Sequence, residues 1–169
     1  MKRSLIRSKL PVVVLTFVLL FLSVQPSKSQ VDPVDKTGLA IGGYDLVSYF
    51  TSIKPLKGSP DFTSEINGAR YLFSSKENKA KFDANPQMYM PQYEGYCALA
   101  IGTTMKKISI DPETYKITDG KLYLFFNGRS FSGTVFNSLE PWLEDEERLI
   151  SRSDKNWPMV KPKKYKHKD

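Results

Sequence analysis

The chain has 169 residues with 25 basic and 18 acidic side chains, a formal net charge of +7 and a single cysteine. One cysteine excludes an intramolecular disulfide framework, so the fold has to rest on packing alone. The positive charge is concentrated at the two ends, because residues 30–160 hold 15 basic and 17 acidic residues. This balance argues against a nucleic-acid-binding face on the folded part, and no nucleic-acid partner is expected.

The first 29 residues have the pattern of a cleavable export signal. Basic residues precede an apolar run over residues 12–22, and the small residues Ser27 and Ser29 follow at a cleavage spacing. The run is much shorter than the roughly 20 residues that a membrane-spanning helix needs. We therefore expect a secreted or periplasmic protein that is not an integral membrane protein after cleavage, with a polar leader over residues 30–37.

Residues 38–158 are expected to form one domain, because about 140 mature residues suffice for a single hydrophobic core. A lysine-rich tail follows over residues 159–169. We interpret this tail as a solvated end of the chain, with a surface anchor for anionic polymer or lipid as the alternative.

The first half of the domain predicts two capped helices and a hairpin. Asp45 can act as the N-cap of a short helix. The Asn-Gly pair at 67–68 stands between two strand-like runs and tolerates positive φ, which predicts a tight turn. Either serine at 74–75 can cap a second helix, and Asn85 ends it because a proline follows.

The second half predicts a buried helix, strands and a terminal helix. The apolar stretch YEGYCALAIG, residues 93–102, is expected to form a short buried helix that Gly102 closes. An Asp-Gly pair at 119–120 predicts a second hairpin, and the Asn-Gly pair at 127–128 could start a third. A terminal amphipathic helix is expected within residues 140–158. Strands are expected at 106–110, 113–118 and 121–126.

These elements predict an α+β fold. It would consist of a small antiparallel sheet of hairpins with short helices and a C-terminal amphipathic helix.

Several ordered motifs carry a resemblance to a known family. They are IGGYDLVSYF, NGARYLFSSKENKAKFDANPQMYMPQYEGYCALAIG, DPETYKITDGKLYLFFN and SDKNWP. Over residues 38–158 the chain resembles the exported single-domain members of the YHS-domain family. The resemblance implies a compact α+β fold in an exported protein, and the wider family is associated with heavy-metal handling.

The chain departs from that family at three places. Metal-binding relatives place a cysteine at the junction where Ser74 and Ser75 stand here, and a hydroxyl is a poor ligand for soft metals. Glu94 occupies a position where exported relatives tend to have glycine. The segment that follows Asn127 is longer than the family's link to its last helix.

The candidate metal ligands are mainly sulfur atoms. A zinc site needs about four nitrogen or sulfur ligands, whereas the mature chain offers Cys97 and His167, which lies in the tail. Copper(I) accepts thioethers, so Met88, Met90, Cys97 and Met105 could supply a sulfur site. We predict a metal site formed by Cys97 with Met88 and Met90, and copper as its metal.

Two other interpretations of Cys97 stay open. It could be a buried, inert side chain in a structural or interaction domain whose aromatic surface binds a protein partner or a small ligand. It could also be the reactive thiol of an enzyme, although the usual histidine base is badly placed in sequence. The sequence favours a binding or accessory protein over an enzyme.

Overall fold

The computed structural model describes residues 37–129 and 133–165. The predicted export signal at 1–29, nearly all of the leader at 30–37 and the end of the lysine-rich tail, with His167, lie outside these residues. None of the helices in the described part is both long and apolar enough to span a bilayer. The elements in chain order are η1 Ile41–Gly43, α1 Ser48–Thr51, β1 Ser59–Ile66, β2 Ala69–Phe73, α2 Lys76–Ala84, α3 Pro86–Tyr89, η2 Gln92–Gly95, α4 Ala98–Thr104, β3 Asp111–Thr118, β4 Lys121–Phe125, β5 Asn127–Arg129, β6 Val135–Asn137, α5 Leu139–Glu144 and α6 Glu146–Val160.

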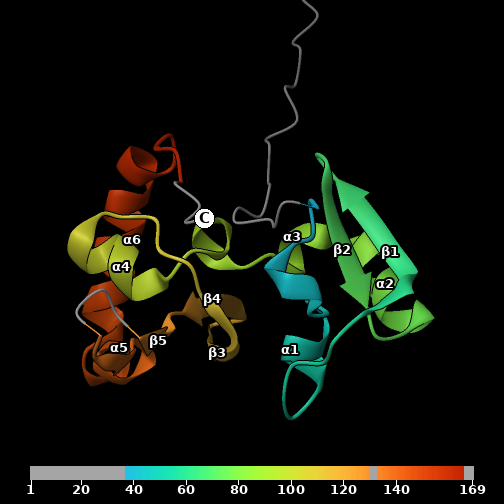
Figure 1. Cartoon of the computed structure of the whole chain (residues 1–169), viewed down its shortest axis with the longest axis horizontal. Helices are drawn as coiled ribbons and strands as arrows, with labels where there is room; N and C mark the ends of the chain where they lie inside the picture. Colours follow the sequence, from blue (N-terminus) through green and yellow to red (C-terminus); the bar gives the residue numbers. More distant parts are fainter. Residues whose placement is uncertain (1–36, 130–132, 166–169) are drawn as a thin grey trace, which may run out of the picture.

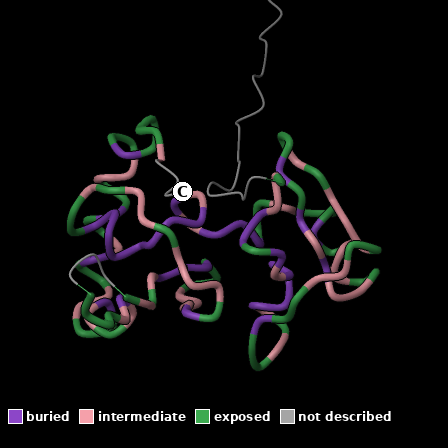
Figure 2. Tube along the Cα trace, in the orientation of Figure 1, coloured by how far each residue is buried: buried purple, intermediate pink, exposed green. Residues whose placement is uncertain are grey.

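The elements are arranged in two halves that lie side by side (Figure 1). The first half, at the right of Figure 1, contains the elements from η1 to α3. The second half, at the left, contains those from α4 to α6. The chain passes from one half to the other through residues 90–97, which are buried along most of their length (Figure 2).

Three antiparallel hairpins make up the strand content of the described residues. Strand β1 pairs with β2 around the Asn-Gly turn, where φ is 53° at Asn67 and 80° at Gly68. Strand β3 pairs with β4 around a second turn, where φ is 50° at Asp119 and 70° at Gly120. Both predicted turns are confirmed, since residues that tolerate positive φ occupy the positions that need it. The α+β class and its hairpins are therefore confirmed.

The longer segment after β4 forms the third hairpin. Asn127 opens β5, which pairs with β6 from Asn127 opposite Asn137 to Arg129 opposite Val135. A third hairpin is therefore present, but the Asn-Gly pair lies in strand β5 and not in its turn. The hairpin leads directly into α5.

Helices form in the first half and at the C-terminus as predicted, but Asp45 is not the N-cap residue of α1. That helix begins at Ser48 with Val47 at its N-cap. The Oδ1 atom of Asp45 accepts hydrogen bonds from the backbone of Val47 and Ser48, so Asp45 holds the turn that precedes α1. Ser75 caps α2, because its hydroxyl accepts a hydrogen bond from the Asn78 backbone at 3.1 Å. The expected terminal helix consists of α5 and α6, and α6 continues to Val160, two residues past the expected end of the domain.

The single helix predicted for residues 93–102 is wrong. Tyr93, Glu94 and Gly95 all have positive φ, so the segment breaks into η2 and α4 with Cys97 between them. Gly102 lies inside α4, which ends at Thr104. A Cβ atom at Gly102 would come within 2.6 Å of the Ser153 hydroxyl, so this glycine lets α4 pack closely on α6.

The strand predicted at 106–110 is also wrong, since these residues belong to no strand. The carbonyl of Ile108 instead accepts a hydrogen bond from the Cys97 backbone at 3.0 Å. This segment is therefore held by the start of α4, and it returns the chain from α4 to β3.

Strand β4 stands between two clusters of buried side chains. Leu122 and Leu124 belong to the first cluster, and Tyr123 and Phe125 belong to the second. Successive side chains of a strand point to opposite faces, so each face of β4 contributes to a separate core. The strand joins the two halves.

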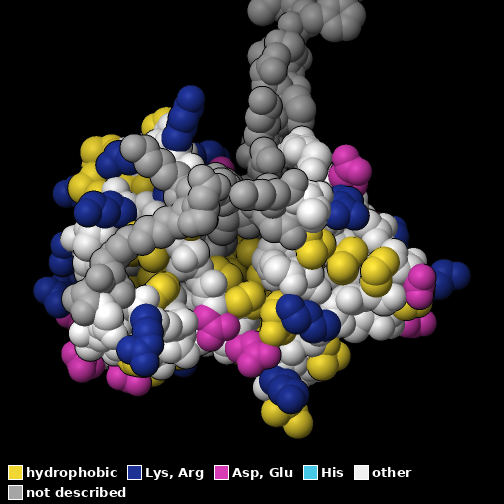
Figure 3. Space-filling model, viewed as in Figure 1, with side chains coloured by type: hydrophobic (Ala, Val, Ile, Leu, Met, Phe, Trp, Pro, Cys, Tyr) yellow, Lys and Arg dark blue, Asp and Glu magenta, His cyan; other side chains and the backbone are white. Residues whose placement is uncertain are grey.

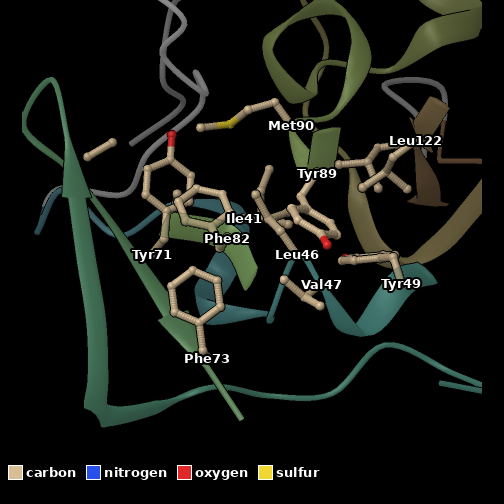
Figure 4. Packing of buried hydrophobic residues seen from close by; sticks show 13 residues of the cluster. Ile41, Leu46, Val47, Tyr49, Tyr71, Phe73, Phe82, Tyr89, Met90 and Leu122 are labelled. Atoms are coloured by element: carbon tan, nitrogen blue, oxygen red, sulfur yellow. The ribbon is translucent and has the colours of Figure 1, made fainter. Parts of the chain in front are cut away.

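Aromatic and aliphatic side chains pack together in the first cluster (Figure 4). The Phe82 ring of α2 lies 5.2 Å from the ring of Tyr71 and 4.9 Å from that of Phe73, both of β2. Burying one large apolar side chain contributes about 1.5–3 kcal/mol to folding. This packing fixes α2 on the β1–β2 hairpin.

Candidate functional site

Cys97 lies immediately before α4, where its backbone and its thiol are both held in place. Its backbone N–H bonds to Ile108, and its carbonyl accepts a hydrogen bond from Ile101 at 3.2 Å. The sulfur atom lies 3.2 Å from the hydroxyl of Ser138, which precedes α5. The residue is 1% exposed, so its predicted burial is confirmed.

A pocket of about 940 Å³ opens beside Cys97. Its walls come from α4 and the segment that follows it, from Phe126, from the β5–β6 hairpin and from the C-terminal residues 163–165. The volume lies within the range of small-molecule sites in proteins. Apolar side chains supply much of the wall, namely Leu99, Ala100, Met105, Ile108, Phe126 and Phe136.

Basic side chains surround this apolar wall, and the described lining residues include no aspartate or glutamate. Figure 3 shows lysine and arginine side chains over the half of the molecule that contains α4 and α6. The pocket therefore combines an apolar wall with a positive rim. The basic lining residues are Lys106, Lys107, Arg129, Lys163 and Lys164.

Two of these cations are tied to the pocket by backbone carbonyls. The Lys163 ammonium donates to the carbonyl of Met105 at 3.2 Å, which joins the C-terminal stretch to the end of α4. The Arg129 guanidinium donates to the carbonyl of Gly133 at 3.0 Å, within the β5–β6 hairpin. Both bonds hold a positive charge near the rim.

Lys107 is held by a carboxylate and by aromatic rings. Glu94 lies 4.0 Å from the Lys107 ammonium and 3.3 Å from that of Lys161. The Lys107 ammonium also lies over the rings of Tyr96 and Trp157, at 4.9 and 5.9 Å from their centroids. Glu94 has a φ of 56°, a backbone conformation that costs a residue with a side chain roughly 1 kcal/mol and that glycine adopts freely.

The three predicted metal ligands lie in different surroundings. Met88 is 56% exposed on α3, whereas Met90 is 6% exposed and belongs to the first core cluster. Cys97 belongs to the second cluster, and Met105 packs against that cluster. In the described part of the chain, no group of three or more His, Cys, Asp or Glu side chains is close enough to hold a metal. The site of Cys97, Met88 and Met90 stays a prediction.

The junction where relatives place a cysteine is used for hydrogen bonding. Asp45 is fully buried, and its Oδ2 atom accepts bonds from the Ser74 backbone at 2.9 Å, the Ser74 hydroxyl at 2.6 Å and the Asn78 amide at 2.7 Å. Together with the bonds to Oδ1, these contacts link α1 to the β2–α2 junction. Ser74 therefore has a structural role in this chain.

Burial raises the pKa values of two tyrosines in the second core cluster. Desolvation raises the pKa of Tyr93, and the hydrogen bond that its hydroxyl donates to Asp154 at 2.9 Å raises it further. Burial likewise raises the pKa of Tyr123 to about 12. Both side chains stay neutral at ordinary pH, so they act as packing and hydrogen-bonding groups within the second core cluster.

Several pocket residues were not predicted from the sequence. The two lysine pairs at 106–107 and 163–164 were visible as basic doublets, but only the fold shows that they face one pocket. Ser138 and Arg129 lie in the longer segment after Asn127 and carry no local signal of a site.

The hairpins, short helices and paired cores define a small α+β domain, and the pocket marks it as a candidate binding domain. The family model of the YHS domain matches residues 47–93, which confirms the resemblance over that segment. No curated protein and no solved structure matches the chain significantly. The matched segment ends at Tyr93, so the pocket lies in the part of the chain that follows it.

Proposed function

We propose that this protein is exported and acts as a binding or accessory protein that takes a small ligand into the pocket beside Cys97. The basic and apolar pattern of residues 1–29 supports export. The observation that carries the binding proposal is the pocket itself, which has an apolar wall, a polar rim and a volume suited to a small molecule.

The lining favours binding over a reaction at the thiol. Catalysis by a cysteine needs a base that generates the thiolate. The neighbour of the Cys97 sulfur is the Ser138 hydroxyl, and the described lining residues include no histidine or carboxylate. Cys97 therefore serves as part of the wall that a ligand contacts.

A neutral fluorescent probe tests this proposal. N-phenyl-1-naphthylamine is expected to bind the folded protein at one saturable site, because the apolar wall can cover its rings. Thr104→Trp places an indole at the edge of the pocket and is expected to weaken binding severalfold. The matched control Gln87→Trp adds the same side chain to exposed α3 in the other half and should leave binding unchanged. Equal binding by both variants, or a lack of saturation, would contradict the proposal.

A metal-related role is the second candidate, since the YHS domain suggests one. Cys97 and Met105 both line the pocket and are soft ligands that suit copper(I). The positive rim opposes a bound cation, which ranks this candidate below a small ligand.

Competition with the chelator bicinchoninate measures copper(I) affinity directly. Under the metal proposal Cys97→Ser should abolish competition, and separate Met88→Leu, Met90→Leu and Met105→Leu variants would show which thioethers take part. Unchanged competition in Cys97→Ser would exclude a copper site at the thiol.

A further inference from the structure

The charge of the pocket is one-sided in a way that the chain as a whole is not. The whole chain has 25 basic and 18 acidic side chains, whereas the charged residues among the described lining are all basic. Five cations around one cavity repel each other, and an anion within a Debye length, about 8 Å at physiological salt, would relieve that repulsion.

The carboxylate that pairs with Lys107 does not neutralise the positive charge of the pocket lining. Glu94 forms ion pairs with Lys107 and with Lys161 from its position outside the pocket lining. The single negative charge of Glu94 can offset one of the five positive charges that line the pocket. Lys106 and Lys164 are exposed residues of the rim, on the segment after α4 and on the C-terminal stretch.

The apolar wall limits which anion would fit. Phe126, Phe136 and Met105 face the same cavity as the cations, so a bare inorganic ion would leave them in contact with water. A ligand that has an apolar body and an anionic group would cover the wall and meet the rim at once.

We propose that the pocket selects amphiphilic organic anions, in which a carboxylate, sulfonate or phosphate is joined to an aromatic or aliphatic body. This inference rests on the proposed binding function and adds the charge class of the ligand. The anionic group lies at the lysine rim, and the apolar body lies against α4 and the β5–β6 hairpin.

Two matched probes separate the charge from the apolar body. The dye 1-anilinonaphthalene-8-sulfonate has the rings of N-phenyl-1-naphthylamine and adds one sulfonate. Fluorescence titration of both probes is carried out on wild-type protein and on the double variant Lys106→Glu/Lys164→Glu. The control Lys54→Glu/Lys76→Glu makes the same change in net charge on exposed residues of the first half.

The pocket variant is expected to bind the sulfonate dye about fivefold more weakly, because exposed charges each contribute modestly. Its affinity for the neutral amine should stay within about twofold of wild type, and the control variant should match wild type for both probes. Rising salt should weaken the sulfonate dye selectively. Circular dichroism verifies folding, and Lys106→Gln/Lys164→Gln should give a smaller loss in the same direction.

The two proposals fail in different ways. If both probes bind at one site and neither responds to the pocket charges or to salt, the anion inference is overturned while the binding function stands. If neither probe saturates a single site on the folded protein, the binding function is overturned and the anion inference with it.

Discussion

The two halves of the molecule use their polar groups in opposite ways. In the first half, the buried carboxylate of Asp45 is surrounded by hydrogen-bond donors from α1, Ser74 and α2. In the second half, Cys97 has a single hydroxyl neighbour and forms part of the wall of a pocket.

This difference assigns separate tasks to the two halves. The segment that matches the YHS family is held by satisfied buried hydrogen bonds, which stabilise a fold but leave little capacity for a ligand. The part after Tyr93 supplies the cavity and its cations. The segment that matches the family therefore lies in the scaffold, and the pocket lies in the part of the chain that follows it.

The largest effect should come from the Asp45 network. Asp45→Ala leaves several buried donors without an acceptor, so the free energy of unfolding should fall by about 3 kcal/mol. Urea unfolding measures the loss, and Asp61→Ala, at an exposed carboxylate, should cost less than about 0.5 kcal/mol. A loss below about 1 kcal/mol for Asp45→Ala would show that this network does not hold the first half.

The second prediction concerns access to Cys97. Because the residue is 1% exposed, a bulky uncharged maleimide should label it about a hundredfold more slowly in native protein than in urea. Binding of the sulfonate dye should slow native labelling further, since Cys97 lines the pocket. Labelling is read without background because the chain has one cysteine. Native labelling at the denatured rate would contradict the burial, and unchanged labelling with dye would place the dye elsewhere.

The third prediction tests the packing that positions α4. Gly102→Ala would bring a methyl group within 2.6 Å of the Ser153 hydroxyl, so unfolding should become easier by about 1–2 kcal/mol. Thermal or urea unfolding measures this loss. Adding Ser153→Ala removes the contacted oxygen and should recover part of the stability. An additive double variant would show that α4 and α6 are not in the close contact described.

The smallest effect should come from Tyr44 in the first half. Its hydroxyl donates to Glu113 at 2.7 Å, and this bond raises the pKa of Tyr44 to about 12. The unfolded value is near 10, so this contribution to stability is complete below pH 10 and is lost as the pH rises towards 12. Tyr44→Phe should cost about 0.5 kcal/mol at neutral pH after screening.

Absorbance titration at alkaline pH measures the pKa of Tyr44 directly. The difference between wild type and Tyr44→Phe should show one phenol that ionises near pH 12. A phenol that ionises near 10 would contradict the bond to Glu113.

Local signals predicted the hairpins and the capped helices well. The pairs at 67–68 and 119–120 determine their turns through backbone conformation alone, and the Ser75 cap acts within one helical turn. The break at Tyr93 and Glu94 could not be predicted, because these residues carry no preference for positive φ and tertiary packing imposes it.

The pocket was even less accessible to sequence reasoning. Its walls come from segments as far apart as Leu99 and Tyr165, and the decisive property is that several lysines face one cavity. Met88 and Met90 lie close to Cys97 in sequence, yet β4 separates the core of Met90 from that of Cys97. Sequence distance alone does not show which core cluster a sulfur atom joins.

The most direct test of the central claim is to map the binding site of 1-anilinonaphthalene-8-sulfonate by amide chemical shifts in ¹⁵N-labelled protein. Saturable changes are expected to concentrate in the residues that surround the pocket, at 97–109, 126–129, 133–138 and 163–165. Residues 47–89 of the matched YHS segment should stay nearly unchanged. Changes that concentrate in residues 47–89, or that never saturate, would contradict the division between scaffold and binding site.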